Sequence, residues 1–384
     1  MAKRITQLDL LRSLAMFFVV AVHTVPYLKP VHGFDIGYVA GEMFLICDPV
    51  FFTLSGYFAI RQPKAPYADY LWKKFLTVSL PILLYGVLLY FYVVYQGKEA
   101  FSCGSFMQWY HSLIAGEWWF VGALIPFLML APWLYEMFES LGAKRQRALF
   151  LLTAAVMTWG IAVTCISSFA AAVRWTGAAA AADTLALLIP TRIIPGGYFV
   201  YFCLGYFVKR LPELFSEKTL RRLCLIGFAL WPLGAVSSVF GYKRADPSYL
   251  WFFITVAVFI FFGRLRFSCP AAGRIVSFVA QRSYSIYLFN YVSVETVFAM
   301  LQAHGLLTDG NPMPFAVRLP LWAAGVVGAY CLALALSCIC DYMFLKPLQA
   351  LLGKIKPSAR EKRVHAKYLL TAERPKETAN GSCG

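Results

Sequence analysis

Residues 6–26 read TQLDLLRSLAMFFVVAVHTVP, an apolar run of membrane-spanning length that carries Asp9, Arg12 and His23. An Asp or Arg at the bilayer centre costs about 2.5 to 3.5 kcal/mol, so each charge needs protein or water around it. On a helix, Arg12 and His23 are separated by about three turns with about 20° left over, so they share one stripe. They lie about 16 Å apart along the axis, about half the hydrocarbon thickness. We predict an inward-facing stripe with a cation near one membrane surface and an imidazole deep toward the other.

The composition indicates an integral membrane protein. Hydrophobic residues make up 60% of the chain and charged residues 14%, compared with about 25% charged in soluble domains. The mean hydropathy is +0.64. The first apolar run is not a signal peptide, because it carries internal charges and similar runs follow it.

Ten apolar runs are predicted to cross the membrane as helices, which gives an all-α fold of about ten transmembrane helices. The predicted segments are residues 8–28, 43–60, 75–96, 118–138, 148–170, 193–208, 223–242, 249–262, 275–300 and 319–344. The sixth and eighth are the shortest.

The net charge of +16 follows the predicted topology. With a cytoplasmic amino terminus, 27 of the 35 Lys and Arg residues fall on the cytoplasmic side, seven fall on the other side, and Arg12 lies within the membrane. This is the positive-inside pattern, and it places both termini in the cytoplasm. Nucleic acid is therefore not an expected partner, whereas the lipid bilayer is.

We expect one polytopic membrane domain over residues 1–350 and a basic, disordered cytoplasmic tail over residues 351–384. The tail's cations can rest on anionic lipid. The ten cysteines show no CxxC pair or other metal-binding spacing, so no metal is expected.

The three polar residues of the first segment each have two interpretations. Asp9 has the capping-box spacing from Thr6, and it can also pair with Arg12 one turn on. Arg12 either reaches the cytoplasmic headgroups or is a fixed cation for a phosphate-bearing donor. His23 is either a core histidine or the general base that removes a hydroxyl proton during acyl transfer.

Further polar and aromatic residues lie at the ends or inside of other predicted segments. Ser55 and Gly56 suit a small-residue helix contact. Glu117 stands before Trp119 at an extracytoplasmic edge, where it is either solvated or faces the outer half of the first helix. The remaining candidates are Arg192, at the same face and either a surface cation or a ligand for an anionic or sugar group, and Asn290 and Glu295 inside the ninth segment.

The chain resembles the membrane acyltransferase 3 family of multi-pass bacterial O-acyltransferases. The resemblance rests on LDLLR at 8–12 with His23, FFTLSGY at 51–57, WF at 119–120 and SYSIYL at 283–288, and it covers about residues 8–344. It implies ten membrane helices, a cytoplasmic acyl-CoA donor, commonly acetyl-CoA, and an acceptor hydroxyl on a cell-envelope glycan or related molecule. By position, His23 and Arg12 match the family's essential histidine and arginine.

Two departures bear on the acceptor. Family members often carry a histidine where Glu117 and Asn290 stand in this chain. Residues 191–205 are also similar to the membrane portion of the serine racemases associated with vancomycin resistance, although no racemase domain follows here.

The sequence thus predicts an acyltransferase of the bacterial inner membrane. Arg12 would hold the phosphates of acyl-CoA with help from Lys73, Arg145 or Arg147. His23 would deprotonate the acceptor or carry the acyl group itself. Asp9 is grouped with His23 and Arg12 as a candidate catalytic residue. Glu117, Trp119, Arg192, Asn290 and Glu295 would contact the glycan or lipid-linked sugar acceptor. The alternative is a transporter of a small polar molecule such as an amino acid, in which the same residues line the substrate path. The sequence shows no internal repeat of the kind that many transporters have, which counts against this alternative.

Overall fold

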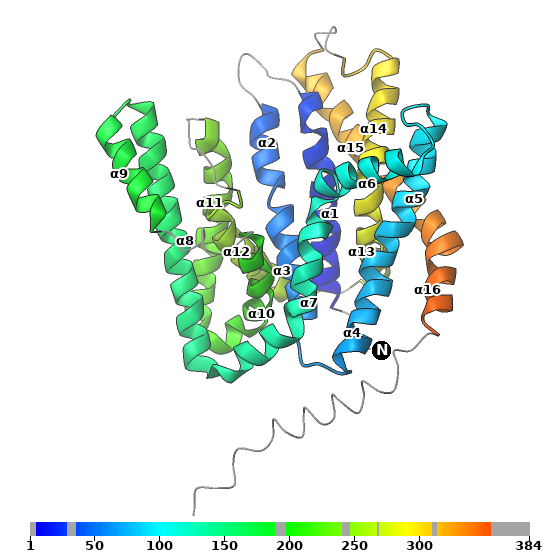
Figure 1. The fold of residues 1–384 in the computed structure, drawn as a ribbon. Coiled ribbons are helices and arrows are strands. Elements are labelled where there is room, and N and C mark those ends of the chain that lie inside the picture. Colours follow the sequence, from blue (N-terminus) through cyan, green and yellow to red (C-terminus); the bar gives the residue numbers. More distant parts are fainter. Residues whose placement is uncertain are drawn as a thin grey trace, which may run out of the picture. The chain divides into compact units, whose positions relative to one another are not determined.

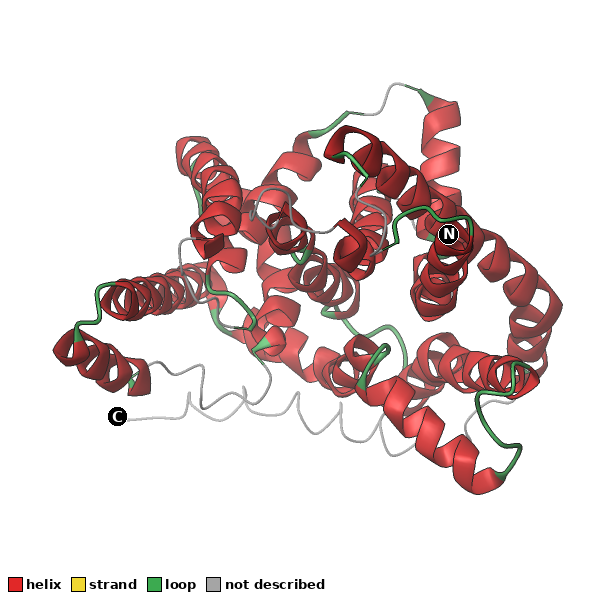
Figure 2. Cartoon of the chain, turned by 90° about the horizontal axis from the view of Figure 1, so that it is seen from above, coloured by secondary structure: helices red, strands yellow, loops and turns green. Residues whose placement is uncertain are grey.

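Every regular element that the structure describes is a helix, as Figures 1 and 2 show. The structure is a computed structural model, and it describes residues 5–28, 36–188, 197–239, 246–266, 269–308 and 313–354. The chain divides into two compact units. Unit 1 comprises Met1–Arg61 and His111–Cys340, and unit 2 comprises Gln62–Tyr110 and Asp341–Gly384.

Unit 1 contains most of the helices. They are α1 (Thr6–Thr24) with the 3-10 turn η1 (Val25–Leu28), α2 (Ile36–Phe44), α3 (Cys47–Ala59), α7 (Trp119–Ser140), α8 (Gly142–Ala172), α9 (Thr176–Leu187), α10 (Tyr198–Leu214), α11 (Glu217–Val239), α12 (Leu250–Arg264), α13 (Pro270–Ala280), α14 (Ser283–Ala303) and α15 (Phe315–Cys340). Helix α6 (Cys103–Ala115) runs across the boundary between the units.

Helix α1 is central to unit 1. It contacts α2, α3, α12, α13, α14 and α15, and Met16, Val20 and Ala21 on it are fully buried. The α-helix ends at Thr24, and the chain continues as the 3-10 turn η1, because Pro26 has no N–H to donate to the carbonyl four residues earlier. The polar residues of the first predicted segment therefore lie on a helix that neighbouring helices of unit 1 contact on several sides.

The second predicted segment is a broken helix rather than a continuous one. Helices α2 and α3 are separated by a turn at Leu45 and Ile46. Pro49 explains the break, because its ring would clash with the carbonyl of Leu45 four residues earlier and it has no N–H to donate. Asp48 is thereby held in the first turn of α3.

Helices α3 and α10 meet with their backbones in contact. A Cβ atom at Gly56 would lie 1.8 Å from the carbonyl oxygen of Phe202, and one at Gly205 would lie 2.4 Å from that of Thr53. Thr53 Oγ1 also donates to the Tyr201 carbonyl at 3.0 Å. The predicted small-residue contact at Gly56 is confirmed, and it fixes the carboxyl-terminal end of α3 against α10.

Seven helical runs within the described residues are long and apolar enough to cross a membrane: Thr6–Leu28, Ile36–Ala59, Tyr67–Tyr95, Trp119–Ser140, Gly142–Ala172, Glu217–Ser237 and Phe315–Leu352. They match seven of the predicted segments. The predicted segment at 275–300 is instead two helices, α13 and α14, with a turn at Gln281 and Arg282. Those at 193–208 and 249–262 correspond to the shorter helices α10 and α12. The count of ten and the orientation of the termini stay predictions.

Unit 2 is built from two chain segments that lie far apart in the sequence. It holds α4 (Tyr67–Lys74), the π-helical turn η2 (Phe75–Ser79) and α5 (Leu80–Tyr95), followed later by the π-helical turn η4 (Asp341–Leu345) and α16 (Lys346–Leu352). The hydroxyl of Tyr85 donates to Asp341, and Gln349 Nε2 donates to the Leu76 carbonyl at 2.8 Å. These two bonds join segments about 260 residues apart. Residues 355–384, most of the predicted tail, lie outside the described residues.

Candidate functional site

The carboxyl-terminal end of α1 brings His23 beside Glu117. The His23 Nδ1 atom lies 4.0 Å from Glu117 Oε2, although the two residues come from α1 and from the turn between α6 and α7. Their side chains are 40% and 39% exposed, so neither is sealed within the packed helices. A small molecule can therefore reach both groups.

Hydrogen bonds from large side chains hold the backbone on both sides of this pair. Trp118, buried beside Glu117, donates from Nε1 to the Leu288 carbonyl at 3.2 Å. The Tyr287 hydroxyl donates to the Glu117 carbonyl at 2.8 Å. At the end of α1, Trp322 Nε1 donates to the Thr24 carbonyl at 3.0 Å. Helices α14 and α15 thus position Glu117 and His23 respectively.

The chemistry available to this pair is proton transfer. A separation of 4.0 Å is too long for a hydrogen bond but short enough for strong electrostatic interaction. A carboxylate facing Nδ1 favours the tautomer with the proton on Nδ1. Nε2 is then left with a free lone pair, which is what a general base needs.

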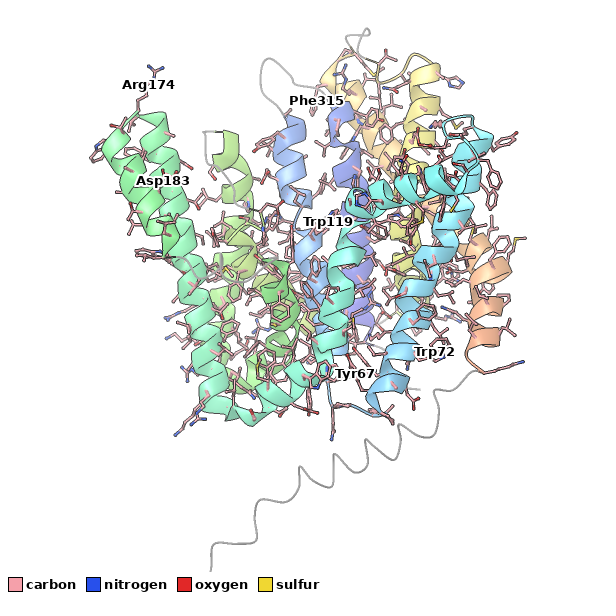
Figure 3. All side chains as sticks on the ribbon, viewed as in Figure 1. Tyr67, Trp72, Trp119, Arg174, Asp183 and Phe315 are labelled. Carbon is pink, nitrogen blue, oxygen red and sulfur yellow. The ribbon has the colours of Figure 1, made fainter. Side chains whose placement is uncertain are left out.

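Aromatic rings surround the start of α7 next to this pair. Trp119, labelled in Figure 3, has its ring centroid 5.2 Å from Tyr198 and 6.1 Å from Phe52. The Tyr198 hydroxyl donates to Asp246 Oδ1 at 2.8 Å. Phe52 is fully buried, whereas Trp119 and Tyr198 are partly exposed. These two rings can therefore contact a sugar ring, while the Tyr198 hydroxyl and Asp246 bond its hydroxyl groups.

Toward the other end of α1, Arg12 contacts an aromatic ring of α3. Its Cζ atom lies 4.9 Å from the Phe58 centroid, a cation–π distance. Asp9 on α1 is buried and accepts a hydrogen bond from Ser277 Oγ of α13 at 2.8 Å. The capping-box interpretation of Asp9 is wrong, because the helix starts one residue earlier than that motif requires: Ile5 is the N-cap and no side chain caps it.

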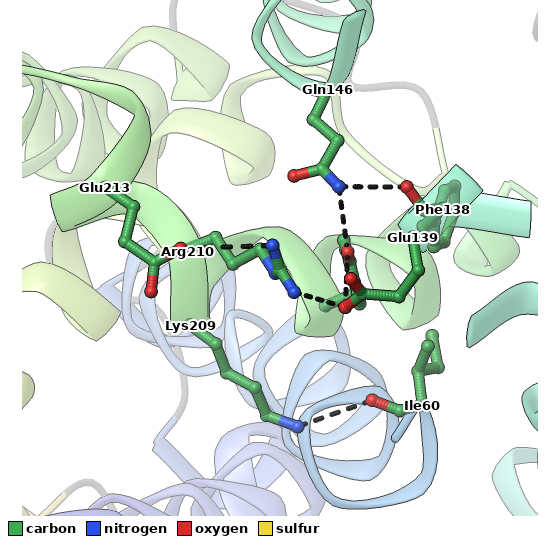
Figure 4. A network of polar contacts seen from close by, with 8 residues as sticks. Ile60, Phe138, Glu139, Gln146, Lys209, Arg210 and Glu213 are labelled. Carbon is green, nitrogen blue, oxygen red and sulfur yellow. Dashed lines mark hydrogen bonds and ion pairs between the residues drawn. The ribbon is translucent and has the colours of Figure 1, made fainter. Parts of the chain in front are cut away.

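At this end of the unit, a polar network that the sequence did not predict joins three helices (Figure 4). Arg210 of α10 pairs with Glu139 of α7, and the Tyr206 hydroxyl donates to Glu139 Oε1 at 3.1 Å. Gln146 of α8 is buried and donates to the Phe138 carbonyl at 2.9 Å and to the Tyr206 hydroxyl at 3.0 Å.

Two further unpredicted contacts involve Lys209. Its Nζ atom lies 3.4 Å from the Ile60 carbonyl oxygen and 4.4 Å from the Tyr57 ring centroid. In the predicted topology, Lys209 and Arg61 count only among the 27 cytoplasmic Lys and Arg residues. Each directly follows the cytoplasmic end of a predicted membrane segment, and this position is the sequence feature that could have identified them.

The remaining predicted site residues are spread over several elements. On α14, Asn290 is buried, and its Oδ1 atom has no hydrogen-bond partner within the described residues; Glu295 is partly exposed on the same helix. Arg145 and Arg147 are exposed on α8, and Arg147 lies 5.4 Å from the Phe215 ring centroid. Lys73 is exposed on α4 of unit 2. Arg192 lies outside the described residues.

Comparison with known proteins gives one family match. Residues 5–340 match the family model Acyl_transf_3, described as an acyltransferase domain. No curated protein and no solved structure matches the chain. The matched range includes both His23 and Arg12, and all of the helices of unit 1.

Proposed function

The chain belongs to the acyltransferase 3 family, and from this premise we propose that it moves an acetyl group from cytoplasmic acetyl-CoA to a hydroxyl on an extracytoplasmic acceptor. The acceptor is a cell-envelope glycan or a lipid-linked sugar, and the enzyme resides in the bacterial inner membrane. Family membership supports a membrane acyltransferase in general. The donor, the acceptor and the cellular location are our proposal.

The observation that carries this proposal is the His23–Glu117 pair. Acyl transfer to an alcohol needs a base, because a neutral hydroxyl attacks a thioester slowly. In the direct route, the acceptor proton moves to His23 Nε2 while the hydroxyl oxygen bonds to the thioester carbonyl carbon. The C–S bond then breaks, and the CoA thiolate takes the proton from the imidazolium.

A second route also begins at His23. Here Nε2 attacks the thioester carbon itself, the C–S bond breaks, and the thiolate takes the proton from Nδ1. The acyl-imidazole then passes its acyl group to the acceptor hydroxyl, whose proton returns to the imidazole. Glu117 stabilises the imidazolium in either route, because its carboxylate faces Nδ1. Rapid quenching followed by mass spectrometry of the His23 peptide distinguishes the two: only the second route adds an acetyl mass to it.

Arg12 supports the placement of the donor at the other end of α1. The bulky, charged nucleotide of CoA stays at the cytoplasmic end, while its pantetheine arm extends along α1 toward His23. Arg12 and His23 lie about 16 Å apart along a straight helix. An extended pantetheine arm can span this distance while the nucleotide stays at Arg12.

The proposed function is tested in inside-out membrane vesicles with acetyl-CoA labelled in the acetyl group. We expect label to move into envelope glycan or lipid in the wild type, and to fall by about 100-fold or more in His23→Ala. Arg12→Ala should require more donor. His304→Gln is the matched control, because His304 is an exposed histidine at the end of α14.

Two outcomes would overturn the proposal. One is no acetyl-CoA consumption by folded wild-type protein in vesicles that retain their envelope acceptors. The other is full transfer by His23→Ala. Uptake of a labelled amino acid without acetyl-CoA consumption would favour the transport alternative.

A further inference from the structure

Two neighbouring cations of α10 have opposite surroundings. Arg210 is balanced by Glu139 and by Glu213, whose Oε2 lies 3.9 Å from its Nη1 (Figure 4). Lys209 pairs with no carboxylate within the described residues, and its contacts are the Ile60 carbonyl and the Tyr57 ring. Glu139 of α7 and Glu213 of α10 are thus both engaged by Arg210.

Lys209 is also held in surroundings that disfavour its charge. Burial first, and then the positive charge of Arg61, lower the pKa of the Lys209 ammonium to about 8. Lys209 lies beyond the predicted membrane segment 193–208. A half-buried cation beside a second cation is electrostatically unsatisfied, and an anion bound between them would relieve both the burial cost and the repulsion.

The same site lies close to Arg12. The Arg12 guanidinium sits over Phe58 and the Lys209 ammonium over Tyr57, and these two rings are in edge contact with centroids 5.1 Å apart. The three distances together limit the separation of Arg12 Cζ and Lys209 Nζ to at most about 14 Å. The close approach of the α3 and α10 backbones at Gly56 and Gly205 places the end of α3 against α10.

We propose that Lys209 and Arg61, together with Arg12, form the subsite that binds the phosphate groups of the CoA donor. This inference rests on the proposed function. It places the binding site for the acyl-CoA donor at α3 and α10. A ligand with more than one negative charge suits the site, since Lys209 and Arg61 are neighbouring cations. CoA carries a 3′-phosphate and a 5′-diphosphate on one nucleotide, so it can satisfy cations that are several ångströms apart. The Lys209 ammonium supplies a compact positive charge, and the Arg61 guanidinium supplies a planar set of hydrogen-bond donors.

The test measures equilibrium binding to the full chain in phosphatidylcholine nanodiscs. The ligands are CoA, dephospho-CoA, which lacks the 3′-phosphate, and pantetheine, which lacks all phosphates. We expect Lys209→Met and Arg61→Gln each to weaken CoA binding by about tenfold. Pantetheine binding should not change, and Lys209→Arg should retain most of the affinity for CoA.

The control is Arg221→Gln, because Arg221 is an exposed cation at the first turns of α11 that pairs with Glu217. It should bind CoA as the wild type does. If Lys209→Met does not yield monodisperse protein, Arg61→Gln decides the question, since Arg61 is exposed and follows the end of α3.

The failures of the two proposals can be told apart. Wild-type protein that binds CoA, with both variants binding equally well, overturns this subsite and leaves the proposed function standing. Wild-type protein that binds neither CoA nor acetyl-CoA overturns both. A lipid phosphate is the other source of the same chemistry. If the variants bind CoA normally in phosphatidylcholine but lose stabilisation by phosphatidylglycerol, the site binds a headgroup and the proposal is wrong.

Discussion

The two ends of the central helix α1 carry different kinds of polar chemistry. At the His23 end, one imidazole faces one carboxylate, 4.0 Å apart, with tryptophan and tyrosine hydrogen bonds fixing the backbone around them. At the Arg12 end, cations rest on aromatic rings, and Lys209 has a second cation nearby in place of a carboxylate. An acid–base pair suits proton transfer, whereas the two neighbouring cations Lys209 and Arg61 suit an anionic ligand.

The strongest way to break this comparison is to separate α3 from α10. Gly56→Ala should unfold or rearrange the Arg12 end, because its Cβ would lie 1.8 Å from the Phe202 carbonyl oxygen. Two backbones cannot move apart as easily as a flexible side chain can. We therefore expect the free energy of unfolding to fall by more than about 3 kcal/mol. Thermal unfolding in detergent measures it, with Ser55→Ala as the control. An unchanged melting temperature for Gly56→Ala would contradict the backbone contact.

Neutralising the carboxylate at the His23 end tests that end alone. Glu117→Gln keeps the shape of the side chain but no longer stabilises the imidazolium. We expect kcat to fall by about 100-fold while the KM for acetyl-CoA stays unchanged.

Glu213→Gln is the control for this change, because Glu213 is an exposed carboxylate of α10 that contacts Arg210. An equal loss of kcat in both variants would show that the effect is not specific to the His23 end.

The pH dependence sharpens the comparison at the Arg12 end. The Lys209 ammonium, whose pKa is lowered to about 8, is charged below that pH and neutral above it. Phosphate binding needs the charged form, so the KM for acetyl-CoA should rise several-fold as the pH increases through about 8. Lys209→Arg should remove this rise, since an arginine stays protonated throughout. A rise that persists unchanged in Lys209→Arg would assign it to another group.

The smallest expected effect concerns the support of Glu117. Tyr287→Phe removes the hydroxyl that donates to the Glu117 carbonyl at 2.8 Å. One neutral hydrogen bond contributes about 1 kcal/mol, so kcat should fall by about fivefold. The KM for the donor should stay the same, because Tyr287 lies away from the phosphate subsite. A change in KM with constant kcat would contradict a positioning role.

Much of the helical pattern could be predicted, because apolar length is written locally in the chain. The segments at 8–28 and 118–138 correspond to spans that the structure describes as Thr6–Leu28 and Trp119–Ser140. The turn at Leu45 and Ile46 was missed, although Pro49 signalled it. The ninth segment was predicted as one helix, and the polar residues Gln281 and Arg282 instead stand in a turn between two.

The site was predicted in part. The shared stripe of Arg12 and His23 follows from helix periodicity within a single segment. The partners of these residues do not, because Glu117 is more than 90 positions from His23 in the sequence and Lys209 is farther still from Arg12. Lys73, Arg145 and Arg147 were chosen as donor ligands because they are basic and cytoplasmic by topology. Sequence position could not show that Lys209 lies beside Arg61 and against the Tyr57 ring.

Residue types and spacing were enough to identify a helical membrane protein of the acyltransferase 3 family, with a histidine and an arginine on its first span. These properties depend on residue types and on spacing within one helix. Only the tertiary structure decided that Glu117 faces His23, that Asp9 bonds to α13 rather than capping α1, and that Lys209 meets the end of α3. Contacts between helices depend on where glycines allow close approach and on which side chains fill the remaining space, and no single segment contains that information.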